Sequence, residues 1–386
     1  MSLPDLSVEL AALDMRGLRR HRRMLESPQS AHVVVDGRDL VAFCSNDYLG
    51  LAADPRLIAA ACEGARASGV GAGASHLILG HTATHHRLEA ALAEFVRLPR
   101  ALLFSTGYMA NIGIVTALVG RHDDVFADKL NHASLNDAAL LARANFKRYA
   151  HGDLATLATL LAASSAPRKL VVTDAVFSMD GDIAPVPELL ALCERHDAWL
   201  LLDDAHGFGV LGAEGGGVLR HFNLASASII YMATLGKAAG VSGAFAAGAP
   251  DLIEVLVQNA RTYIYSTATP PLLAQALLAS LDIFAREQWR RVVLKQLIDQ
   301  FKQGVAGMRW QLMPSDTAIQ PLVIGGNEAA LKVSTALAQR GVLVPAIRPP
   351  TVPPGSARLR ISLSAAHTAQ DIVRLVCTLH QVEKEF

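Results

Sequence analysis

The stretch Ile229-Ile-Tyr-Met-Ala-Thr-Leu-Gly-Lys-Ala-Ala-Gly240 decides how the rest of the chain is interpreted. Its first four residues form a short apolar run, which is typical of a buried strand. Thr234 and Lys237 follow in a glycine-flanked turn directly after that strand. Burial removes hydration from an ammonium group and lowers its pKa toward the neutral amine that forms a Schiff base. From this stretch alone, an ordinary surface lysine is at least as good an interpretation.

Composition limits the classes of protein to be considered. The 386 residues are 51% hydrophobic and 18% charged, which describes a compact fold of two domains, or of one large and one smaller domain. The formal net charge is zero, so there is no electrostatic case for nucleic acid or an anionic membrane as the main partner.

Cysteine usage and the first residues favour a cytoplasmic location. The four cysteines are scattered and form no C-x-x-C pair, which is typical of free thiols in a reducing compartment. Asp5, Glu9 and Asp14 interrupt any signal-peptide core, and the apolar runs are shorter than a membrane span.

Short apolar runs alternate with helical patterns through the middle of the chain. The candidate strands are residues 101–104, 125–127, 169–173, 199–203, 229–232 and 245–247. This alternation predicts an α/β fold with a mostly parallel sheet covered on both faces, and ligands at the C-terminal ends of its strands.

The flanking segments complete the predicted organisation. Residues 5–25 have helical periodicity and end in a basic run, interpreted as a solvated helix face or as an arginine facing an acidic substrate. Asp36-Gly37 predicts a type I′ hairpin over residues 33–43. Further helices are expected over 55–67, 82–97, 327–340 and 368–383, and further strands over 319–324, 342–346 and 357–363. The predicted divisions are an N-terminal segment (1–45), a large domain (46–285) and a small C-terminal domain (286–386).

Two groups at strand ends carry candidate chemistry. Asp203, Asp204 and His206 follow the strand at 199–203, where an aspartate can pair with a cationic ring nitrogen; a structural ion pair or helix cap is the alternative. Ser105-Thr-Gly-Tyr108 follows another strand and opens a helical pattern, and free amides at a helix N-terminus bind phosphate.

The run Gly207-Phe-Gly-Val-Leu-Gly212 matches the dinucleotide-binding pattern G-x-G-x-x-G. A dinucleotide site also needs a helix that opens on the glycines and an acidic residue about 20 positions further on. The glycines at 215–217 break any such helix, and no acidic residue occurs between Glu214 and Asp251. We therefore predict no dinucleotide site here.

Histidines give weaker signals. His132, at a predicted helix start, is a cap or a ring neighbour. His81, His85 and His86 include an i, i+4 pair, but the sequence offers no evident third ligand, so no metal site is expected.

Together, a phosphate cradle, an aspartate for a ring nitrogen, a histidine and a lysine amine are the groups that pyridoxal phosphate requires. Several motifs in the chain resemble those of the α-oxoamine synthases, which are fold-type I pyridoxal-phosphate enzymes. These motifs are Ser45-Asn-Asp-Tyr-Leu-Gly50, Thr106-Gly-Tyr-Met-Ala-Asn111, Asn131-His-Ala-Ser134, Phe177-Ser-Met-Asp-Gly-Asp182, Asp203-Asp-Ala-His-Gly207 and Thr234-Leu-Gly-Lys237.

The resemblance implies a role for each matching residue. Lys237 would hold the cofactor and move a proton, and Asp203 would keep the pyridine nitrogen protonated. His206 would contact the ring hydroxyl and His132 would stack on the ring. The implied phosphate ligands are Gly107, Tyr108, Ser178 and Thr234. The implied substrate contacts are Arg360 with the amino-acid carboxylate, and Thr351 and Arg20 with the acyl substrate, although Arg19, Arg22 and Arg23 lie close to Arg20.

Within the family, the C-terminal loop Ala346-Ile-Arg-Pro-Pro-Thr-Val-Pro353 is similar to members that condense L-alanine with a pimeloyl thioester. The resemblance also implies a homodimer, and it leaves open whether coenzyme A or an acyl carrier protein carries the acyl group. A glycine C-acyltransferase is the alternative enzyme. His76, which follows Ser75, is a local departure from the family pattern.

Overall fold

The computed structural model describes residues 5–386. Its main sheet has seven strands in the order β3-β9-β8-β7-β6-β4-β5. The strands are β3 (Arg100–Phe104), β4 (Asp124–Asp128), β5 (Asn145–Tyr149), β6 (Lys169–Asp174), β7 (Trp199–Asp203), β8 (Ile229–Thr234) and β9 (Ala244–Gly248). The five strands from β8 to β5 run parallel, and β9 lies antiparallel to both of its neighbours. The predicted α/β fold is therefore confirmed.

Both faces of this sheet are buried, which explains why its strands read as continuous apolar runs. Leu201 and Ile230 pack on one face with α4 (Gly107–Leu118), and Leu200 and Leu202 pack on the other. The remaining helices around the sheet are α2 (Pro55–Ser68), α3 (Ala83–Val96), α5 (Ala133–Ala142), α6 (Leu154–Ala162), α7 (Val186–Arg195), α8 (Val218–Phe222), α9 (Pro250–Asn259), α10 (Arg261–Ile264) and α11 (Pro271–Arg286), with a π-helical turn η1 (His76–Gly80) before α3.

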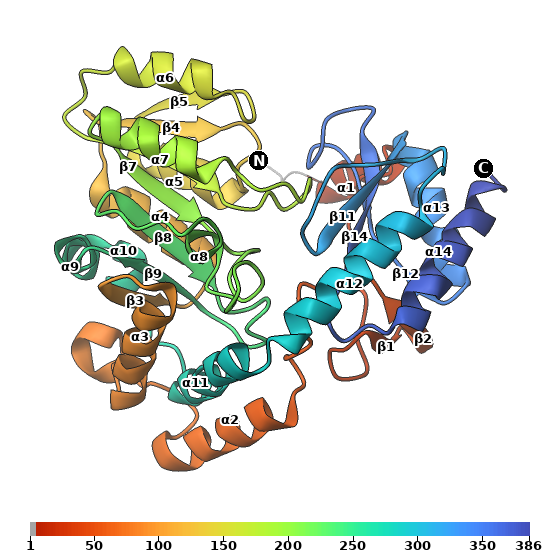
Figure 1. Cartoon of the computed structure of the whole chain (residues 1–386), viewed down its shortest axis with the longest axis horizontal. Helices are drawn as coiled ribbons and strands as arrows, with labels where there is room; N and C mark the ends of the chain where they lie inside the picture. Colours follow the sequence, from red (N-terminus) through yellow and green to blue (C-terminus); the bar gives the residue numbers. More distant parts are fainter. Residues whose placement is uncertain (1–4) are drawn as a thin grey trace.

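The C-terminal part forms a second group of elements, drawn on the right in Figure 1. An antiparallel sheet has the order β10-β11-β14-β13, and the N-terminal hairpin pairs with β12 in a separate small sheet. These strands are β1 (His32–Val35), β2 (Arg38–Ala42), β10 (Gln311–Leu312), β11 (Ile319–Gly325), β12 (Val342–Leu343), β13 (Ala346–Ile347) and β14 (Ala357–Ser362); the helices are α12 (Trp289–Gly304), α13 (Asn327–Gln339) and α14 (Ala369–Glu383). The division of the chain at residues 45 and 285 stays a prediction.

Three local predictions differ from the structure. The N-terminal helix α1 (Leu6–Met15) ends well before residue 25, because Gly17 takes a φ of 60° and closes the last turn. The strand predicted over 342–346 is two short strands in different sheets, and Pro345, which has no N–H to donate, separates them. The edge strand β5 was not predicted, because its sequence Asn-Phe-Lys-Arg-Tyr carries charges.

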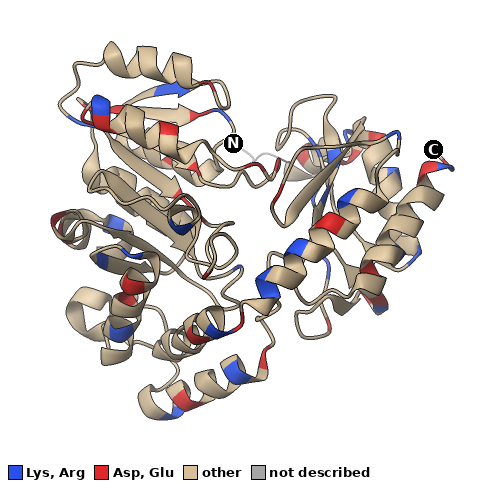
Figure 2. Ribbon diagram, viewed as in Figure 1, with Lys and Arg blue, Asp and Glu red and all other residues tan. Residues whose placement is uncertain are grey.

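The hairpin prediction is confirmed. Asp36 and Gly37 have φ values of 48° and 71°, the left-handed conformation that a type I′ turn requires at both positions. The charge distribution also agrees with a net charge of zero, since acidic and basic residues are interspersed over both parts of the molecule (Figure 2).

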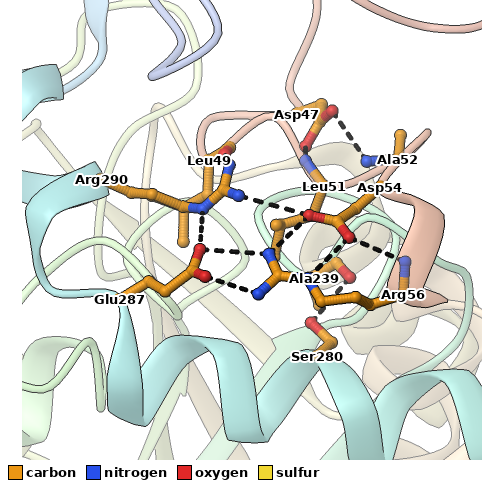
Figure 3. A network of polar contacts seen from close by, with 10 residues as sticks. All are labelled: Asp47, Leu49, Leu51, Ala52, Asp54, Arg56, Ala239, Ser280, Glu287 and Arg290. Carbon is orange, nitrogen blue, oxygen red and sulfur yellow. Dashed lines mark hydrogen bonds and ion pairs between the residues drawn. The ribbon is translucent and has the colours of Figure 1, made fainter.

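A polar network ties α2 to the start of α12 (Figure 3). We call Asp54, Arg56, Glu287 and Arg290 the junction network. Arg56 pairs with both carboxylates, at 2.8 Å from Asp54 and 2.5 Å from Glu287. Arg290 reaches Glu287 at 2.8 Å and Asp54 at 3.3 Å, and it donates to the Leu49 carbonyl at 2.7 Å. Two cations and two anions are thus mutually paired where the two parts of the molecule meet.

None of the helices within residues 5–386 combines the length and apolar character that crossing a bilayer requires.

Candidate active site

A cavity of about 190 Å³ opens at the C-terminal ends of the parallel strands. It is lined by Gly107, Tyr108, His132, Ser134, Asp174, Ser178, Asp203, Ala205, His206, Met232, Thr234 and Lys237. All of the predicted cofactor-binding residues belong to this lining, although their segments span more than a hundred positions of the chain.

Lys237 lies in the turn between β8 and β9. The turn is closed by a hydrogen bond from Leu235 N to the Gly243 carbonyl, and Gly240, at a φ of 71°, passes so close to Leu51 that a Cβ would meet its carbonyl carbon at 2.7 Å. Burial lowers the pKa of Lys237 to about 8, against the opposing pull of the Asp203 carboxylate. The amine is therefore much closer to its neutral, nucleophilic form than a surface lysine.

A chain of hydrogen bonds leads from this amine to a buried arginine. Lys237 Nζ lies 2.8 Å from His206 Nε2, and His206 Nδ1 lies 2.6 Å from the hydroxyl of Tyr48. Tyr48 donates to Asn46 Oδ1 at 3.1 Å, and Arg360 Nη1 donates to the same oxygen at 3.3 Å. Burial, followed by the charges of Lys237 and Arg360, lowers the pKa of His206 well below its usual value. A neutral His206 then accepts from Lys237 and donates to Tyr48, so each group is satisfied.

Asp203 is the last residue of β7 and is held at both oxygens. Its Oδ2 accepts from Asn111 Nδ2 at 2.7 Å, and its Oδ1 accepts from Ala205 N at 3.1 Å. Asn111, on the first turns of α4, also donates to Ser134 Oγ at 2.8 Å. The carboxylate is fixed in place with one face toward the cavity, as a partner for a cationic ring nitrogen must be.

Asp174 is a second buried carboxylate in the lining of this cavity. It ends β6 and pairs in register with Asp203. Burial and the neighbouring charge of Asp203 raise its pKa well above the usual value. Its Oδ2 accepts from the backbone N–H of His132 at 2.7 Å, so Asp174 fixes the segment that carries this histidine.

His132 has the capping role, and it also lies at the cavity; its role as a ring neighbour stays a prediction. It is the N-cap of α5, with Nδ1 accepting from Ser134 N at 3.3 Å and lying 2.7 Å from Ser134 Oγ. Its ring is also exposed and lines the cavity.

Asp204 points away from the cavity despite its position beside Asp203. Its Oδ2 accepts from Val218 N and from the Tyr231 hydroxyl, both at 2.7 Å, inside the core. Burial raises its pKa to about 7. Asp204 thus holds the loop before α8 and belongs to the scaffold.

The N-terminus of α4 forms a part of the cavity wall beside Thr234. Thr106 caps this helix by accepting from Met109 N at 3.1 Å, and Gly107 and Tyr108 form its first turn. The first backbone N–H groups of a helix have no intrahelical acceptor, so this wall is suited to an anion. Ser178 lies at its side, and the Thr234 hydroxyl donates to the Gly243 carbonyl at 3.1 Å.

Arg358 and Arg360 extend from the same face of β14, as strand alternation predicts. Arg358 forms a salt bridge with Asp180. Arg360 is also buried, with Nε donating to the Ser178 carbonyl at 2.5 Å and Nη1 donating to Ser362 Oγ at 2.8 Å. Among the described residues, no carboxylate lies within salt-bridge distance of Arg360. The structure thereby distinguishes two arginines that spacing alone could not separate.

A larger cavity, of about 760 Å³, lies between the N-terminal segment and the small sheets. Arg20 lines it together with Arg19, Arg23 and Arg348, but Arg19 is already paired with Asp14 at 2.6 Å. Thr351 does not line either cavity and is exposed in its loop. The predicted acyl-substrate residues are therefore not brought together in this structure.

The glycine pattern at 207–212 is not followed by a helix. These residues form turns, and the next helix, α8, begins only at Val218. This geometry agrees with the prediction that no dinucleotide site is formed here.

The sequence offered no evident third ligand for the histidines around α3, but the structure brings candidate third ligands beside them. The fold brings His76 beside His81 and His85, and it places Glu89 beside His81 and His86. The sequence did not reveal the first grouping because η1 folds His76 back toward α3; Glu89, three positions after His86 on α3, was not considered as a ligand.

Four residues of the site belong to the motifs, but the sequence assigned them no role: Asn46, Tyr48, Asn111 and Ser134. Asp174 lies outside the motifs and was not singled out. Asp174 had a usable signal, because it directly follows the strand predicted over 169–173, and the C-terminal ends of neighbouring parallel strands meet at one edge. The contacts of Tyr48 with His206 and of Asn111 with Asp203 depend on tertiary packing and leave no local signal.

A family model described as aminotransferase class I and II matches residues 38–379. The 8-amino-7-oxononanoate synthase of Nitrosospira multiformis is 65% identical over 370 residues, which cover 96% of this chain and 93% of the relative.

Solved structures of two enzymes are similar to this chain over nearly its whole length. A structure of serine palmitoyltransferase (SPT) with PLP is 30% identical, with a TM-score of 0.93 and coverage of 98% of this chain and 97% of the other. An 8-amino-7-oxononanoate synthase from Francisella tularensis is 31% identical, with a TM-score of 0.79 and coverage of 90% and 97%.

The resemblance inferred from six motifs is therefore confirmed over nearly the whole length. The chain belongs to the aminotransferase class I and II family and, within it, to the pyridoxal-phosphate-dependent 8-amino-7-oxononanoate synthases.

Proposed function

We propose that this enzyme condenses L-alanine with a pimeloyl thioester, releasing carbon dioxide and the thiol carrier. The observation that carries this proposal is Arg360, a buried guanidinium without a carboxylate partner among the described residues. A buried cation is costly unless it is paired. The carboxylate of an amino-acid substrate supplies the missing charge, and a hydrogen-bonded chain connects this arginine to Lys237.

The residues of the smaller cavity fit pyridoxal phosphate. The first turn of α4 offers N–H groups to the phosphate, and Asp203, oriented by Asn111, offers a fixed carboxylate to the ring nitrogen. When bound, this cofactor withdraws electrons from the carbon atom that it activates. Gly107, Tyr108, Ser178 and Thr234 are the proposed phosphate ligands, and His132 and His206 are the proposed ring contacts.

Lys237 is the proposed base. Its pKa of about 8 leaves a substantial neutral fraction at physiological pH. A neutral amine takes the proton from the Cα of alanine, and the fixed turn keeps the amine at the reacting atom. His206 holds Nζ from one side at 2.8 Å, which limits the orientations that the amine can take.

Asp203 is the proposed partner of the cofactor ring, and Arg360 is the proposed partner of the substrate carboxylate. Asp203 keeps a proton on the ring nitrogen through charge pairing, because a carboxylate favours the cationic form of its neighbour. Arg360 binds the alanine carboxylate, for which a planar guanidinium offers two parallel N–H groups.

The larger cavity is the proposed location of the acyl substrate. Its basic lining suits the distal carboxylate of a pimeloyl chain, and Arg20 and Arg23 line it without an acidic partner among the described residues. Cys44 also lines this cavity, and burial raises the pKa of its thiol against the charges of Arg23 and Arg360. We keep Arg20 as the proposed contact, and Thr351 as a contact that requires its loop to move.

We also propose a homodimer in the cytoplasm, with coenzyme A or an acyl carrier protein as the acyl donor. The π-helical turn η1 supports the dimer, since Leu77, Ile78 and Leu79 expose 47%, 79% and 84% of their surface. Light scattering on the purified holoenzyme tests the subunit number, and a monomer at micromolar concentration contradicts this proposal.

The alternative is a glycine C-acyltransferase, which a panel of amino acids and acyl thioesters distinguishes. The holoenzyme is incubated with alanine or glycine and with pimeloyl, acetyl or palmitoyl thioesters, and the products are identified by mass spectrometry. We expect 8-amino-7-oxononanoate from alanine and a pimeloyl thioester. Preferred turnover of glycine with acetyl-CoA contradicts the proposal.

A further inference from the structure

A cluster of histidines and one glutamate lies outside the active site, at the start of α3. We propose that His81, His86 and Glu89 bind one divalent transition-metal ion such as Zn²⁺. One ligand atom from each residue lies within 4.8 Å of the other two. Two imidazoles and one carboxylate are a common protein ligand set for such ions, and they leave a coordination position open.

The orientation of His81 supports this site. Its Nδ1 lies 3.0 Å from His76 Nδ1, and its Nε2 lies 3.9 Å from Glu89 Oε2. When His81 donates through Nδ1 to His76, the lone pair of Nε2 points toward Glu89 and is available to a metal. Histidine ligands usually donate their second N–H to such an acceptor, which fixes the tautomer.

His76 is suited to act as that acceptor. Its ring stacks on Tyr263, with centroids 4.9 Å apart and planes inclined by 13°. This stacking holds the His76 ring in the orientation that places its Nδ1 3.0 Å from His81 Nδ1.

Glu89 has one carboxylate oxygen that is hydrogen-bonded within the protein and one that is available to a metal ion. Its Oε1 accepts from the backbone N–H of Leu103, in β3, at 2.9 Å, which fixes the carboxylate plane. Its Oε2 lies at 3.9 Å from His81, beyond hydrogen-bond distance.

His86 completes the set from the same helix. It precedes Glu89 by three positions, so the two side chains lie on one face of α3. The His86 ring is exposed, and no group among residues 5–386 forms a hydrogen bond with it. Ligand atoms around a tetrahedral zinc ion lie about 3.4 Å apart, so closing the 3.9 Å gap requires a movement of about 0.5 Å.

A different triad, His76 with His81 and His85, is also compact but is less free to bind. His85 Nδ1 accepts from Thr82 N at 3.1 Å and so caps α3, while Nε2 lies 2.8 Å from the Thr269 carbonyl. Both nitrogens of His85 are in use, and a metal would have to break one of these contacts. The proposal therefore assigns the ion to the set that contains Glu89.

The test is a Zn²⁺ titration of the untagged holoenzyme, after treatment with a chelator and desalting, in competition with a chromophoric chelator. We expect one bound ion per chain. His86→Ala and Glu89→Gln should each raise the Kd at least 10-fold, the order of effect seen when metal sites lose such groups. Gln keeps a side-chain oxygen for Leu103 N, and His86 is exposed, so both variants should fold.

The matched control is His122→Ala, which removes an exposed histidine far from α3 in the sequence and should leave the Kd unchanged. The proposal is overturned if Zn²⁺ does not bind at one equivalent, or if the wild type, His86→Ala and His122→Ala have the same Kd. A Kd that rises for His85→Ala but not for His86→Ala also overturns it, because the ion then occupies the other triad. If Glu89→Gln does not fold, His86→Ala decides alone.

Discussion

The junction network and the lining of the active-site cavity both contain several ionisable groups. The junction network favours the charged forms of its groups, whereas the cavity favours the neutral forms of several of its groups. In the junction network each carboxylate meets an arginine, and these contacts, led by the hydrogen bonds to Arg56, lower the pKa values of Asp54 and Glu287. In the active site, burial raises the pKa of Asp174 and lowers that of Lys237 to about 8. One region stabilises ions and the other moves several groups toward neutrality.

This difference indicates where chemistry is available. A charge that is fully paired within the protein has little to offer a ligand, whereas a group held near neutrality, or a cation without a counter-ion, gains from one. Lys237 is a group held near neutrality, and Arg360 is a cation without a counter-ion. Arg358, which lies two residues before Arg360 on β14, is paired with Asp180 and therefore resembles the paired arginines of the junction network.

The largest expected effect distinguishes Asp203 from Asp204. Asp203→Asn should retain the cofactor and lose about 10²- to 10³-fold in kcat, because a neutral amide cannot hold the ring proton. Asp204→Asn should keep most of kcat and lose about 1–3 kcal/mol of stability, since it disturbs a buried pair of hydrogen bonds. The measurements are kcat and the free energy of unfolding for both variants. If both variants fold and lose kcat equally, Asp204 contributes to catalysis as much as Asp203 does, and its assignment to the scaffold is wrong.

The next effect distinguishes the two arginines of β14. Arg360→Lys should raise the Kd for alanine at least about 10-fold while cofactor binding is retained, because a lysine keeps the charge but loses the two-point geometry. Arg358→Lys is the matched control and should leave that Kd nearly unchanged, since its contact is Asp180. The Kd is read from the change in the cofactor absorbance on adding alanine. The assignment is reversed if only the Arg358 variant loses alanine binding.

The smallest effect concerns the stability of the junction. Arg290→Gln should lower the free energy of unfolding by about 1–2 kcal/mol at pH 7, less than for a fully buried pair because Arg56 still neutralises both carboxylates. The folded pKa values of Asp54 and Glu287 are depressed, so their stabilisation is present above the unfolded pKa values of about 4 and is lost as the pH falls through the folded values. The difference in the free energy of unfolding between Arg290→Gln and the wild type should therefore become smaller below about pH 4.

Denaturant titrations at pH 7, 5 and 3 measure this dependence. Arg286→Gln is the control, because Arg286 forms an exposed pair with Asp282, and such a pair contributes at most a few tenths of a kcal/mol. An effect of Arg290→Gln that does not change with pH would show that packing, and not charge, holds the junction.

Much of the fold could be predicted because its strands are buried on both faces. β8 and β7 are continuous apolar runs, and their boundaries agree with the prediction within two residues. β5 escaped prediction because an edge strand carries Lys147 and Arg148, and α1 is shorter than its periodicity because one glycine ended it.

The site could be predicted in part for a related reason. Lys237, Asp203 and Asp174 follow recognisable strands, so the topology alone brings them to one edge of the sheet. The neighbours that orient them come from other segments. Tyr48 is 158 positions from His206, and Asn111 is 92 positions from Asp203, and only the packed structure brings each pair together.

The central claim is that Lys237 is the amine that carries the cofactor. The most direct test is reduction of the purified holoenzyme with borohydride, followed by digestion and mapping of the modified peptide by mass spectrometry. We expect the reduced cofactor to be attached to Lys237 alone, in the peptide that contains Thr234-Leu-Gly-Lys. Attachment to another lysine, such as Lys147 or Lys169, would contradict it.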